Sequence, residues 1–353
     1  MSGTDFASTF NPGRIVFGPG KLALLPAELS LLGVSRAMVL ATPFQRTEAE
    51  ALAERLGGLA AGVFADAAMH TPVSVTERAL AACDAAEADS VVSFGGGSTI
   101  GLGKAIAWRK GIPHLAVATT YAGSEVTPIL GETRDGLKST MRDRSILPDT
   151  VIYDPDLTLG LPVAASVNSG LNAMAHAVEG LFSRDRNPVS SWQAIEGIRA
   201  LKEALPQIVD NPGNIGARSL ALYGSWLCGT VLGAAGMALH HKICHVLGGT
   251  FDLPHAETHA ILLPQTAHYN ADAAAEMFRP LQDLFGSSVG AGLYDFSASL
   301  GAPVALRDLG LAEADLDRAA DIAMENPYWN PRPIEHAPIR ALLQSAWEGS
   351  RPR

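Results

Sequence analysis

Cysteine and charged residues are both scarce in this chain of 353 residues. Its three cysteines, Cys83, Cys228 and Cys244, have no zinc-like spacing and are too few for a disulfide framework. We therefore expect reduced thiols and a cytoplasmic location. Charged residues make up 18% of the chain, against about 25% in an average soluble protein, while apolar residues reach 47%. This composition predicts a folded protein with a large core and disfavours a disordered chain.

No run of lysine or arginine stands out, and the net charge is −10. Proteins that bind nucleic acid need a basic surface to neutralise phosphates, so nucleic acid is not expected as a partner. The first 20 residues lack a basic start followed by an apolar stretch, which is not the pattern of a secretory signal. The uncharged segment 219–239 contains four glycines, two serines and a threonine. These small residues favour a close-packed buried helix over a membrane span.

Short β-like runs alternate with helix-like runs over the first 155 or so residues, which is the pattern of a parallel sheet with crossover helices. Two capping boxes, Thr47 with Glu50 and Ser74 with Glu77, predict helix starts. The predicted strands lie at residues 37–41, 63–64, 90–94 and 115–118, and predicted helices include 75–86 and 99–108.

The texture changes after Pro162, where long Ala/Leu/Gly-rich stretches have helical periodicity and almost no β-branched runs. The predicted fold class is therefore α/β plus all-α. Residues 1–160 are expected to form an N-terminal, Rossmann-like, doubly wound parallel sheet domain. Residues 161–353 are expected to form a C-terminal all-helical domain.

A glycine turn, Gly95-Gly96-Gly97-Ser98, lies between the third predicted strand and a predicted helix. A helix N-terminus offers free N–H groups and partial positive charge, and glycines let a pyrophosphate approach the backbone. The usual G-x-G-x-x-G spacing is not met, because Ile100 stands where the third glycine is expected. A simple tight turn is the alternative, but we predict that these four residues hold a dinucleotide.

Two other strand ends add polar residues at the same edge of the predicted sheet, where α/β proteins bind ligands. No carboxylate follows the second strand, where Thr42 stands, so the sequence does not decide between NADH and NADPH. The fourth strand leads into a polar turn, which ordinary loop chemistry would also explain. The further candidate cofactor-binding residues are Thr42, Thr119, Thr120 and Ser124.

Histidines crowd into the stretch 238–268, which holds six of the ten in the chain. Asn172 and His176 are four residues apart, as are His241 and His245, so each pair shares one face of a helix. A lone histidine is more often a packed or surface residue, but this clustering beside glycines predicts a functional site. The candidates are Asn172, His176, His241, His245 and His255, which follows ten residues after His245.

Four segments carry a family resemblance: the GGGS loop, the turn TTYAGSEVT, the helix SGLNAMAHAVEG, and HHKICHVLGGTFDLPHAETHAILLP. In this order, over nearly the whole chain, they resemble the iron-containing alcohol dehydrogenase superfamily. The resemblance implies a dehydroquinate synthase-like fold, NADH or NADPH as cofactor, and a homodimer. In metal-dependent members an Asp and three His bind Fe²⁺ or Zn²⁺, and the corresponding positions here are Asn172, His176, His245 and His255.

Asn172 departs from that pattern, since a neutral amide is a poor ligand for a divalent cation. Three histidines alone can still hold Zn²⁺. Asn172 together with HHKICH, in which Lys242 follows paired histidines, resembles the maleylacetate reductase branch of the superfamily. That resemblance implies metal-free, NAD(P)H-dependent reduction of the C=C bond of maleylacetate to 3-oxoadipate during the degradation of aromatic compounds.

The chemistry of such a substrate suits the candidate residues. Maleylacetate is a dianion whose alkene is conjugated to a ketone, so hydride addition places negative charge on the ketone oxygen. Without a metal, donors such as protonated histidine or lysine must hold that charge. Our hypothesis is that His241 and His245 polarise the ketone or supply a proton, while Lys242 or Arg142 anchors a carboxylate. His176, His255 and Asn172 complete the predicted catalytic set.

Three other interpretations stay open. The first is a metal-dependent (Fe/Zn) alcohol dehydrogenase of the same superfamily, and the second is a lyase like dehydroquinate synthase; Asn172 disfavours the metal that both need. The third is a nucleotide-binding protein without turnover, which would leave the histidine cluster unexplained. The expected partners are a small dicarboxylate and a second copy of the chain, with no membrane, no nucleic acid and no metal.

Overall fold

The computed structural model describes residues 13–134, 137–326 and 328–353. Within these residues, the chain divides into two compact units. Residues 13–161 together with Gly213–Leu222 form one, here called the sheet unit. Pro162–Pro212 together with Tyr223–Arg353 form the other, here called the helical unit. Each unit contains hydrophobic clusters of its own.

The sheet unit is built on a six-stranded parallel sheet in the order β1–β8–β5–β4–β2–β3. The strands near residues 37–41, 63–64, 90–94 and 115–118 are confirmed, whereas β1 and β8 were not predicted. A separate antiparallel pair joins β6 and β7. The strands are β1 Arg14–Phe17, β2 Ala37–Leu40, β3 Ala60–Phe64, β4 Ser90–Gly95, β5 His114–Ala118, β6 Ile129–Arg134, β7 Leu137–Arg142 and β8 Thr150–Tyr153.

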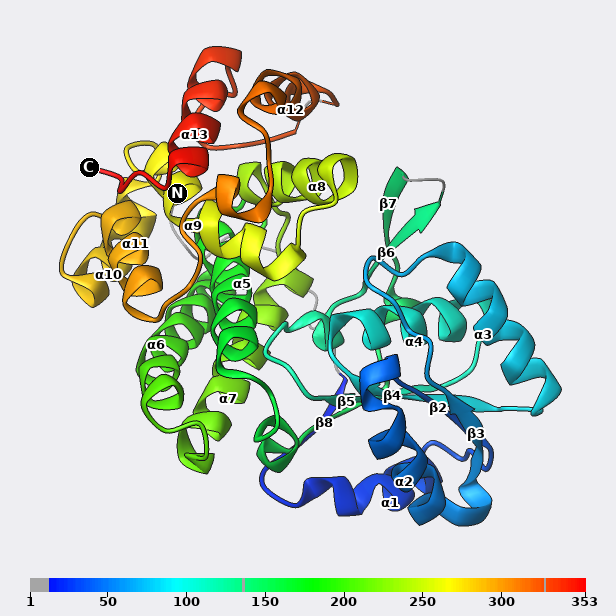
Figure 1. Cartoon of the computed structure of the whole chain (residues 1–353). Helices are drawn as coiled ribbons and strands as arrows, with labels where there is room; N and C mark the ends of the chain where they lie inside the picture. The colour runs from blue at the N-terminus through cyan, green and yellow to red at the C-terminus, as the bar shows by residue number, and fades with distance from the viewer. Residues whose placement is uncertain (1–12, 135–136, 327) are drawn as a thin grey trace. The chain divides into compact units, whose positions relative to one another are not determined.

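Helices cover both faces of the parallel sheet (Figure 1). Successive side chains of a strand point to opposite faces, so the neighbours Val91 and Val92 join different apolar clusters. Val92 packs with residues of α1 and α2, and Val91 packs with residues of α3 and α4. The predicted doubly wound α/β architecture is therefore confirmed. These helices are α1 Leu25–Leu31, α2 Arg46–Leu56, α3 Val73–Ala85 and α4 Gly97–Lys110.

Both predicted capping boxes are wrong. Helix α2 continues from a short 3₁₀ helix, η2 (Pro43–Gln45), so Thr47 already lies inside the helix and caps nothing. Helix α3 begins at Val73, directly after Pro72, which places Ser74 inside the first turn. In both cases a proline with its fixed φ angle starts the helical turn earlier than the capping pattern indicates.

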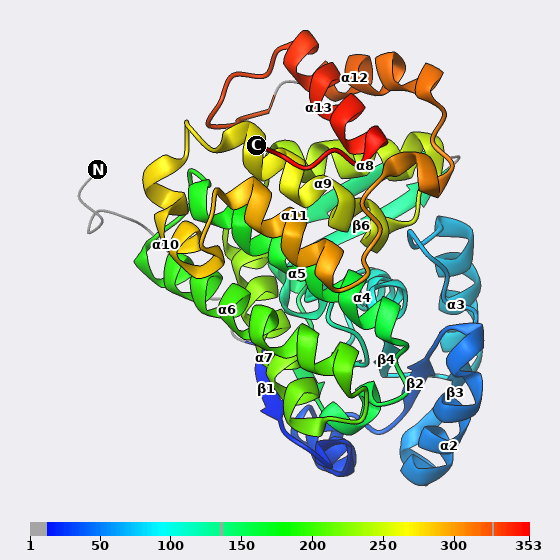
Figure 2. The same ribbon diagram turned by 60° about the vertical axis from the view of Figure 1, so that its left-hand side comes forward.

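The helical unit contains helices and no strand among its described residues, which confirms the all-α prediction. Helix α5 packs against α6 and α9, and α8 packs against α9 (Figures 1 and 2). Helix α7 has residues in both units. The helices are α5 Val163–Phe182, α6 Pro188–Asp210, α7 Ile215–Ala234, α8 Leu239–Phe251, α9 His255–Asn270, α10 Ala275–Phe285, α11 Val289–Ser299, α12 Leu316–Met324 and α13 His336–Glu348.

Short 3₁₀ helices connect the larger elements. They are η1 Lys21–Leu24, η2 Pro43–Gln45, η3 Gly57–Leu59, η4 Ser124–Val126, η5 Arg144–Ile146, η6 Pro155–Thr158, η7 Leu306–Leu309 and η8 Glu313–Asp315.

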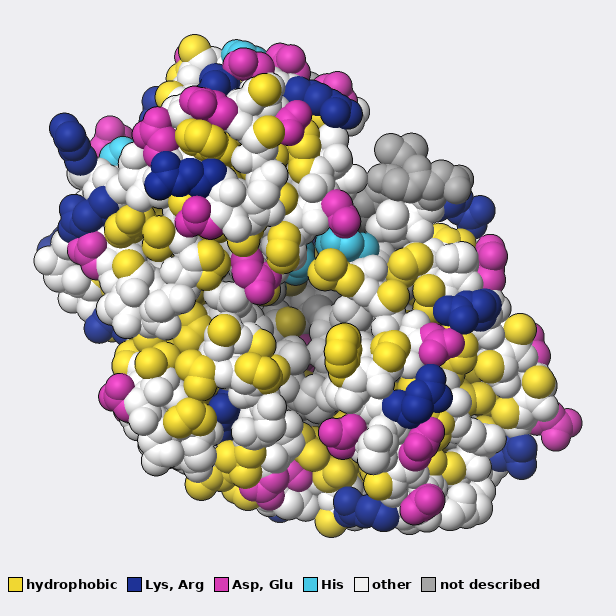
Figure 3. All heavy atoms as spheres, in the orientation of Figure 1, with side chains coloured by type: hydrophobic (Ala, Val, Ile, Leu, Met, Phe, Trp, Pro, Cys, Tyr) yellow, Lys and Arg dark blue, Asp and Glu magenta, His cyan; other side chains and the backbone are white. Residues whose placement is uncertain are grey.

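The hydropathy of the helices and the distribution of surface charge are relevant to membrane and nucleic-acid partners. In the described part of the chain no single helix is long and apolar enough to cross a membrane; α7 and α8 meet that criterion only as a pair bent by 96°. On the face drawn in Figure 3, lysine and arginine side chains lie scattered among aspartate and glutamate.

Candidate active site

The glycine turn of the sheet unit is the first candidate site. Strand β4 ends at Gly95 and helix α4 begins at Gly97. A Cβ atom on Gly95 would lie 2.5 Å from Thr99 Oγ1, and one on Gly96 would lie 2.7 Å from Thr120 Cγ2, so the fold itself requires both glycines. A Cβ on Gly97 would meet only Ser124 Oγ, at 3.9 Å. Packing therefore does not explain Gly97, whereas close approach of a ligand to the first turn of α4 would.

The strand order brings the other predicted cofactor residues to this turn. Strands β2 and β4 are neighbours, and the chain leaves them in opposite directions, toward β3 and β5, which makes this the switch point of the sheet. Thr42 follows β2 and precedes η2. Gln45, the last residue of η2, donates through Nε2 to Thr119 Oγ1 at 3.1 Å. Together with the contacts of Gly96 and Gly97, this bond joins the segments that follow β2, β4 and β5.

Lys104 on α4 is a residue that the sequence analysis missed. It is buried, and its Nζ donates to Ser124 O at 2.5 Å, to Thr127 Oγ1 at 2.8 Å and to Ile129 O at 2.9 Å. Burial lowers the pKa of Lys104 to about 7, although the nearby Glu125 carboxyl group opposes the shift. This amine therefore fastens the polar turn after β5 onto α4. The one signal in the sequence is that Lys104 is the single charged residue between Asp89 and Arg109.

The histidine cluster of the helical unit is the second candidate site. It gathers six imidazole rings from α5, α8 and α9, including the predicted His176, His241, His245 and His255. The rings of His176 and His241 have centroids 5.1 Å apart, and His241 is 6.4 Å from His245. The two rings that were not predicted are His240, 5.3 Å from His241, and His259, 4.4 Å from His255.

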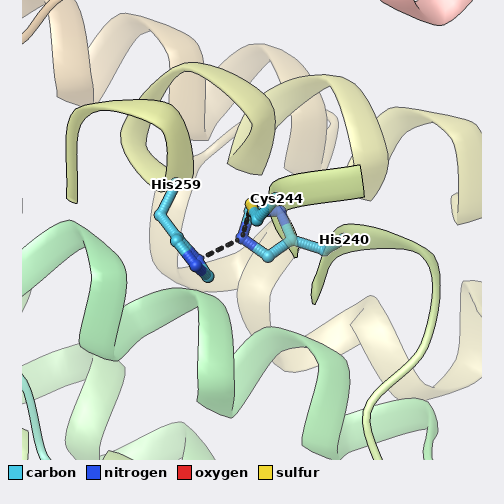
Figure 4. A group of neighbouring side chains, drawn as sticks. All are labelled: His240, Cys244 and His259. Carbon is cyan, nitrogen blue, oxygen red and sulfur yellow. Dashed lines mark hydrogen bonds between the residues drawn. The ribbon is translucent and has the colours of Figure 1, made fainter. Parts of the chain in front are cut away.

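Hydrogen bonds organise the interior of the cluster, as Figure 4 shows for three of its residues. His240 Nε2 lies 2.8 Å from His259 Nδ1 and 3.6 Å from Cys244 Sγ, and His240 Nδ1 lies 3.0 Å from Thr266 Oγ1. The ligand atoms of His240, Cys244 and His259 are near enough to one another to hold a metal ion. These hydrogen bonds account for their closeness without one.

Burial decides the charge of three of the histidines. Desolvation, with smaller contributions from neighbouring histidines, lowers the pKa of His176, His240 and His259 well below 6.5. These rings are therefore neutral imidazoles near neutral pH. His176, which belongs to the predicted catalytic set, therefore brings a neutral ring to the site, because the helical packing removes it from water.

A buried carboxylate, Glu179 of α5, holds the start of α8. Its Oε1 accepts from the backbone N–H of His240 at 2.7 Å, and its Oε2 accepts from that of Ala238 at 3.0 Å. Oε2 also lies 2.6 Å from His241 Nδ1. Glu179 was not among the predicted residues, since its partners lie about 60 positions away in the sequence and leave no local signal.

The two predicted carboxylate anchors lie in different settings. Lys242 Nζ sits over the Tyr328 ring, 5.7 Å from its centroid. The Tyr328 hydroxyl is buried and has no hydrogen-bond partner among the described residues, and burial together with Glu179 raises its pKa. Arg142 is exposed at the end of β7 in the sheet unit. Tyr328 is thus an additional polar group beside Lys242 that the sequence analysis missed.

The predicted metal position can be tested on its donor atoms. That position is formed by Asn172, His176, His245 and His255; of these, Asn172 Oδ1 and His176 Nδ1 are buried and have no partner within the described parts of the chain. An amide and three imidazoles bring no negative charge. Two carboxylates lie on the same helices: Glu179 of α5 accepts bonds from α8, and Glu257 of α9 accepts from Asn168 Nδ2 at 3.1 Å. Non-haem Fe²⁺ sites commonly combine histidines with a carboxylate. Asn172 offers a neutral amide where the resemblance expects that carboxylate, so the residues at this position fit Fe²⁺ poorly.

Both parts of the chain match models of one protein family. Residues 12–155 match the family described as iron-containing alcohol dehydrogenase. Residues 166–347 match the C-terminal part of the Fe-containing alcohol dehydrogenase family. The chain belongs to the iron-containing alcohol dehydrogenase family, in agreement with the resemblance seen in the sequence.

Within this family, the chain is similar to maleylacetate reductases. It is 61% identical to the maleylacetate reductase of Rhizobium sp. strain MTP-10005, over 98% of this chain and 99% of that protein. It is 51% identical to the maleylacetate reductase of Burkholderia cepacia, over 96% and 97% of the two chains. The crystal structure of maleylacetate reductase from Agrobacterium tumefaciens superimposes with a TM-score of 0.96 at 61% identity, covering 99% of this chain and 100% of that one.

The lowered pKa of Lys104 predicts that the free energy of unfolding depends on pH, and that Lys104→Met reduces this dependence. An unfolded lysine titrates at about 10.4, whereas Lys104 in the fold titrates at about 7. Between these values the unfolded chain binds one more proton, so the free energy of unfolding should rise with pH by up to about 1.4 kcal/mol per unit. Urea unfolding at pH 7.5 and 8.5 should show this rise for the wild type and a smaller one, by about 1 kcal/mol, for Lys104→Met. Equal slopes would contradict the assignment.

Proposed function

We propose that this chain reduces the C=C bond of maleylacetate to give 3-oxoadipate, with NADH or NADPH as the hydride donor. The observation that carries the proposal is its similarity to maleylacetate reductases over almost the entire chain. The site agrees with that assignment, because Asn172 replaces a metal-binding carboxylate while buried polar atoms of His176 and His241 remain without a partner among the described residues.

In this proposal the sheet unit binds the dinucleotide. The pyrophosphate lies at the N-terminus of α4, where the N–H groups of Gly97 and Ser98 have no carbonyl four residues earlier in the helix. Thr119, Thr120 and Ser124 line the neighbouring turn. Thr42, at the end of β2, offers a hydroxyl group and no carboxylate to the adenosine ribose. The absence of that charge is compatible with NADPH as well as NADH.

The helical unit binds the substrate and manages its charge. When bound, the reduced nicotinamide supplies a hydride to the alkene carbon that is β to the ketone. The electron pair of the C=C bond then moves toward the ketone, and a proton must reach the carbon between them to complete the product. His241 Nε2 is the buried nitrogen placed to hold or give that proton, and His245 lies beside it. Lys242 offers positive charge to a substrate carboxylate.

We further propose that the reaction needs no metal. The neutral donor set around Asn172 supports this, as does the hydrogen bonding that already joins His240, Cys244 and His259.

A homodimer and a cytoplasmic location belong to the same proposal. The three cysteines are buried and free, as in reducing compartments, and the homodimer is what the resemblance to the family implies. Light scattering of the purified protein checks the dimer.

The activity and its metal independence can be measured together. Protein purified without added metal and treated with a chelator should oxidise NADH or NADPH when maleylacetate is added, at the rate of untreated protein. Simple aldehydes and ketones should give at most about 1% of that rate, since they lack the conjugated alkene. Metal analysis of the active protein should find less than about 0.1 metal ion per chain. A stoichiometric metal whose removal abolishes turnover would instead favour the metal-dependent alcohol dehydrogenase.

The glycine turn offers a separate test of the cofactor position. Gly97→Ala adds a methyl group that the protein has room for, and alanine is favoured in helices by about 1 kcal/mol, so stability should be unchanged or slightly higher. The same methyl group should hinder a pyrophosphate and raise the KM for NADH by about tenfold. Gly111→Ala, at the other end of α4, is the control for stability: Gly111 has a φ of 64°, so alanine there should lower stability and leave the KM for NADH unchanged. Wild-type affinity for NADH in Gly97→Ala would place the pyrophosphate elsewhere.

A further inference from the structure

Glu179 is a buried residue of α5, and both of its carboxylate oxygens accept hydrogen bonds from the start of α8. Oε1 accepts from the backbone N–H of His240 at 2.7 Å. Oε2 accepts from the backbone N–H groups of Ala238, at 3.0 Å, and His241, at 3.4 Å. The shortest contact, at 2.6 Å, joins Oε2 to the side chain of His241 through Nδ1. A carboxylate that satisfies three backbone donors has only accepting capacity left for the imidazole.

This contact determines which nitrogen of His241 carries hydrogen. Because the carboxylate only accepts, Nδ1 must be the donor, and the neutral ring then has its lone pair at Nε2. Nε2 is buried and has no hydrogen-bond partner within the described residues. The ring also lies beside His176 and His259, with centroids 5.1 Å away in both cases, so packing fixes its plane. One nitrogen of His241 is therefore fixed to the protein and the other is left for a ligand.

We propose that Glu179 is a positioning residue that keeps His241 with hydrogen on Nδ1, so that the ring exchanges protons with the substrate only at Nε2. The substrate in this statement is the one given by the proposed function. While Nε2 holds the proton to be transferred, both nitrogens carry hydrogen and Nδ1 stays bonded to Oε2 of Glu179. The Nε2–H bond breaks as the new C–H bond forms on the carbon next to the ketone. The ring keeps its Nδ1–H, becomes neutral, and regains a proton from solvent.

A purely structural role for Glu179, as a cap for α8, makes different predictions. A cap requires acceptors for the backbone N–H groups, and it is indifferent to which ring nitrogen of His241 is protonated. Glu179→Gln separates the two roles. Glutamine has one accepting oxygen, whereas Oε2 of Glu179 serves two backbone N–H groups as well as Nδ1, and Oε1 serves the third backbone N–H group. With the amide nitrogen facing Nδ1, the ring must accept there and its hydrogen moves to Nε2. With the amide oxygen facing Nδ1, the hydrogen bond is kept but the carboxylate charge beside the ring is lost.

Selective ¹⁵N labelling of histidine reports the hydrogen position directly by NMR. The His241 signal is identified by its loss in His241→Asn. The wild type should show His241 protonated on Nδ1 when neutral, and Glu179→Gln should show a larger fraction of the ring with hydrogen on Nε2. A wild-type ring with hydrogen on Nε2 would overturn the proposal even if no variant folds. This measurement needs no substrate, so its result stands whether or not maleylacetate is reduced.

Kinetics supply the second readout. In Glu179→Gln, kcat for maleylacetate should fall by about 100-fold, the scale of lost general acid catalysis, while KM stays within about threefold. Glu179→Asp, which restores a carboxylate, should recover at least tenfold of that loss. Thr266→Val is the matched control, because it removes a buried hydrogen bond from the neighbouring His240 without touching His241. It should keep kcat within about threefold of the wild-type value.

The possible results distinguish failure of the positioning role from failure of the proposed function. Folded Glu179→Gln protein with wild-type kcat, or an equal loss of kcat in Thr266→Val, would overturn the positioning role. Wild-type protein that shows the expected His241 hydrogen position but no activity with maleylacetate would contradict the proposed function and leave the Glu179–His241 contact supported.

Discussion

The N-terminus of α8 rests on a carboxylate that comes from another helix, and the histidine cluster depends on that contact. Burying an ionised carboxyl group costs several kcal/mol unless donors surround it. Glu179 meets three backbone N–H groups at the positive end of α8 and the ring of His241. Hydrogen bonds to a charged group contribute about 1.5–3 kcal/mol each, so these donors offset the cost. The contact thereby defines where α8 begins and where its first two histidines lie.

His240 and His241 are neighbours in the first turn of α8, but their side chains have different hydrogen-bond partners. Consecutive residues of a helix point about 100° apart, so the side chains of His240 and His241 make different hydrogen bonds, although both rings lie beside His259. His240 turns toward α9, where it meets His259 and Thr266. His241 turns toward Glu179 and His176 on α5. One histidine therefore ties two helices together, while the other keeps a nitrogen free of partners within the described residues.

Much of the architecture could be predicted from the sequence, because buried parallel strands form continuous apolar runs. Two strands of the parallel sheet were missed: β1 is short and partly exposed, and β8 is buried but only four residues long, so neither forms a long apolar run. The glycine turn was predicted correctly in position, since a strand, three glycines and a helix follow one another in the sequence. Glu179 and Lys104 were missed for one physical reason. Each acts on partners brought near only by the fold, and in the sequence each is an ordinary helical residue.

The neutral side chain at position 172 suits a negatively charged substrate. Asn172 stands where metal-dependent relatives have an aspartate, and the proposed substrate is a dianion. Asn172 is buried and its Oδ1 has no partner among the described residues. In metal-free chemistry, an aspartate there would be a buried charge with no cation to balance it. It would also repel a dianion, and two like charges about 4 Å apart at an effective dielectric constant of about 20 cost about 4 kcal/mol. The amide keeps the size of the side chain and removes both penalties. The negative charge of Glu179 does not act in the same way, because its donors surround it.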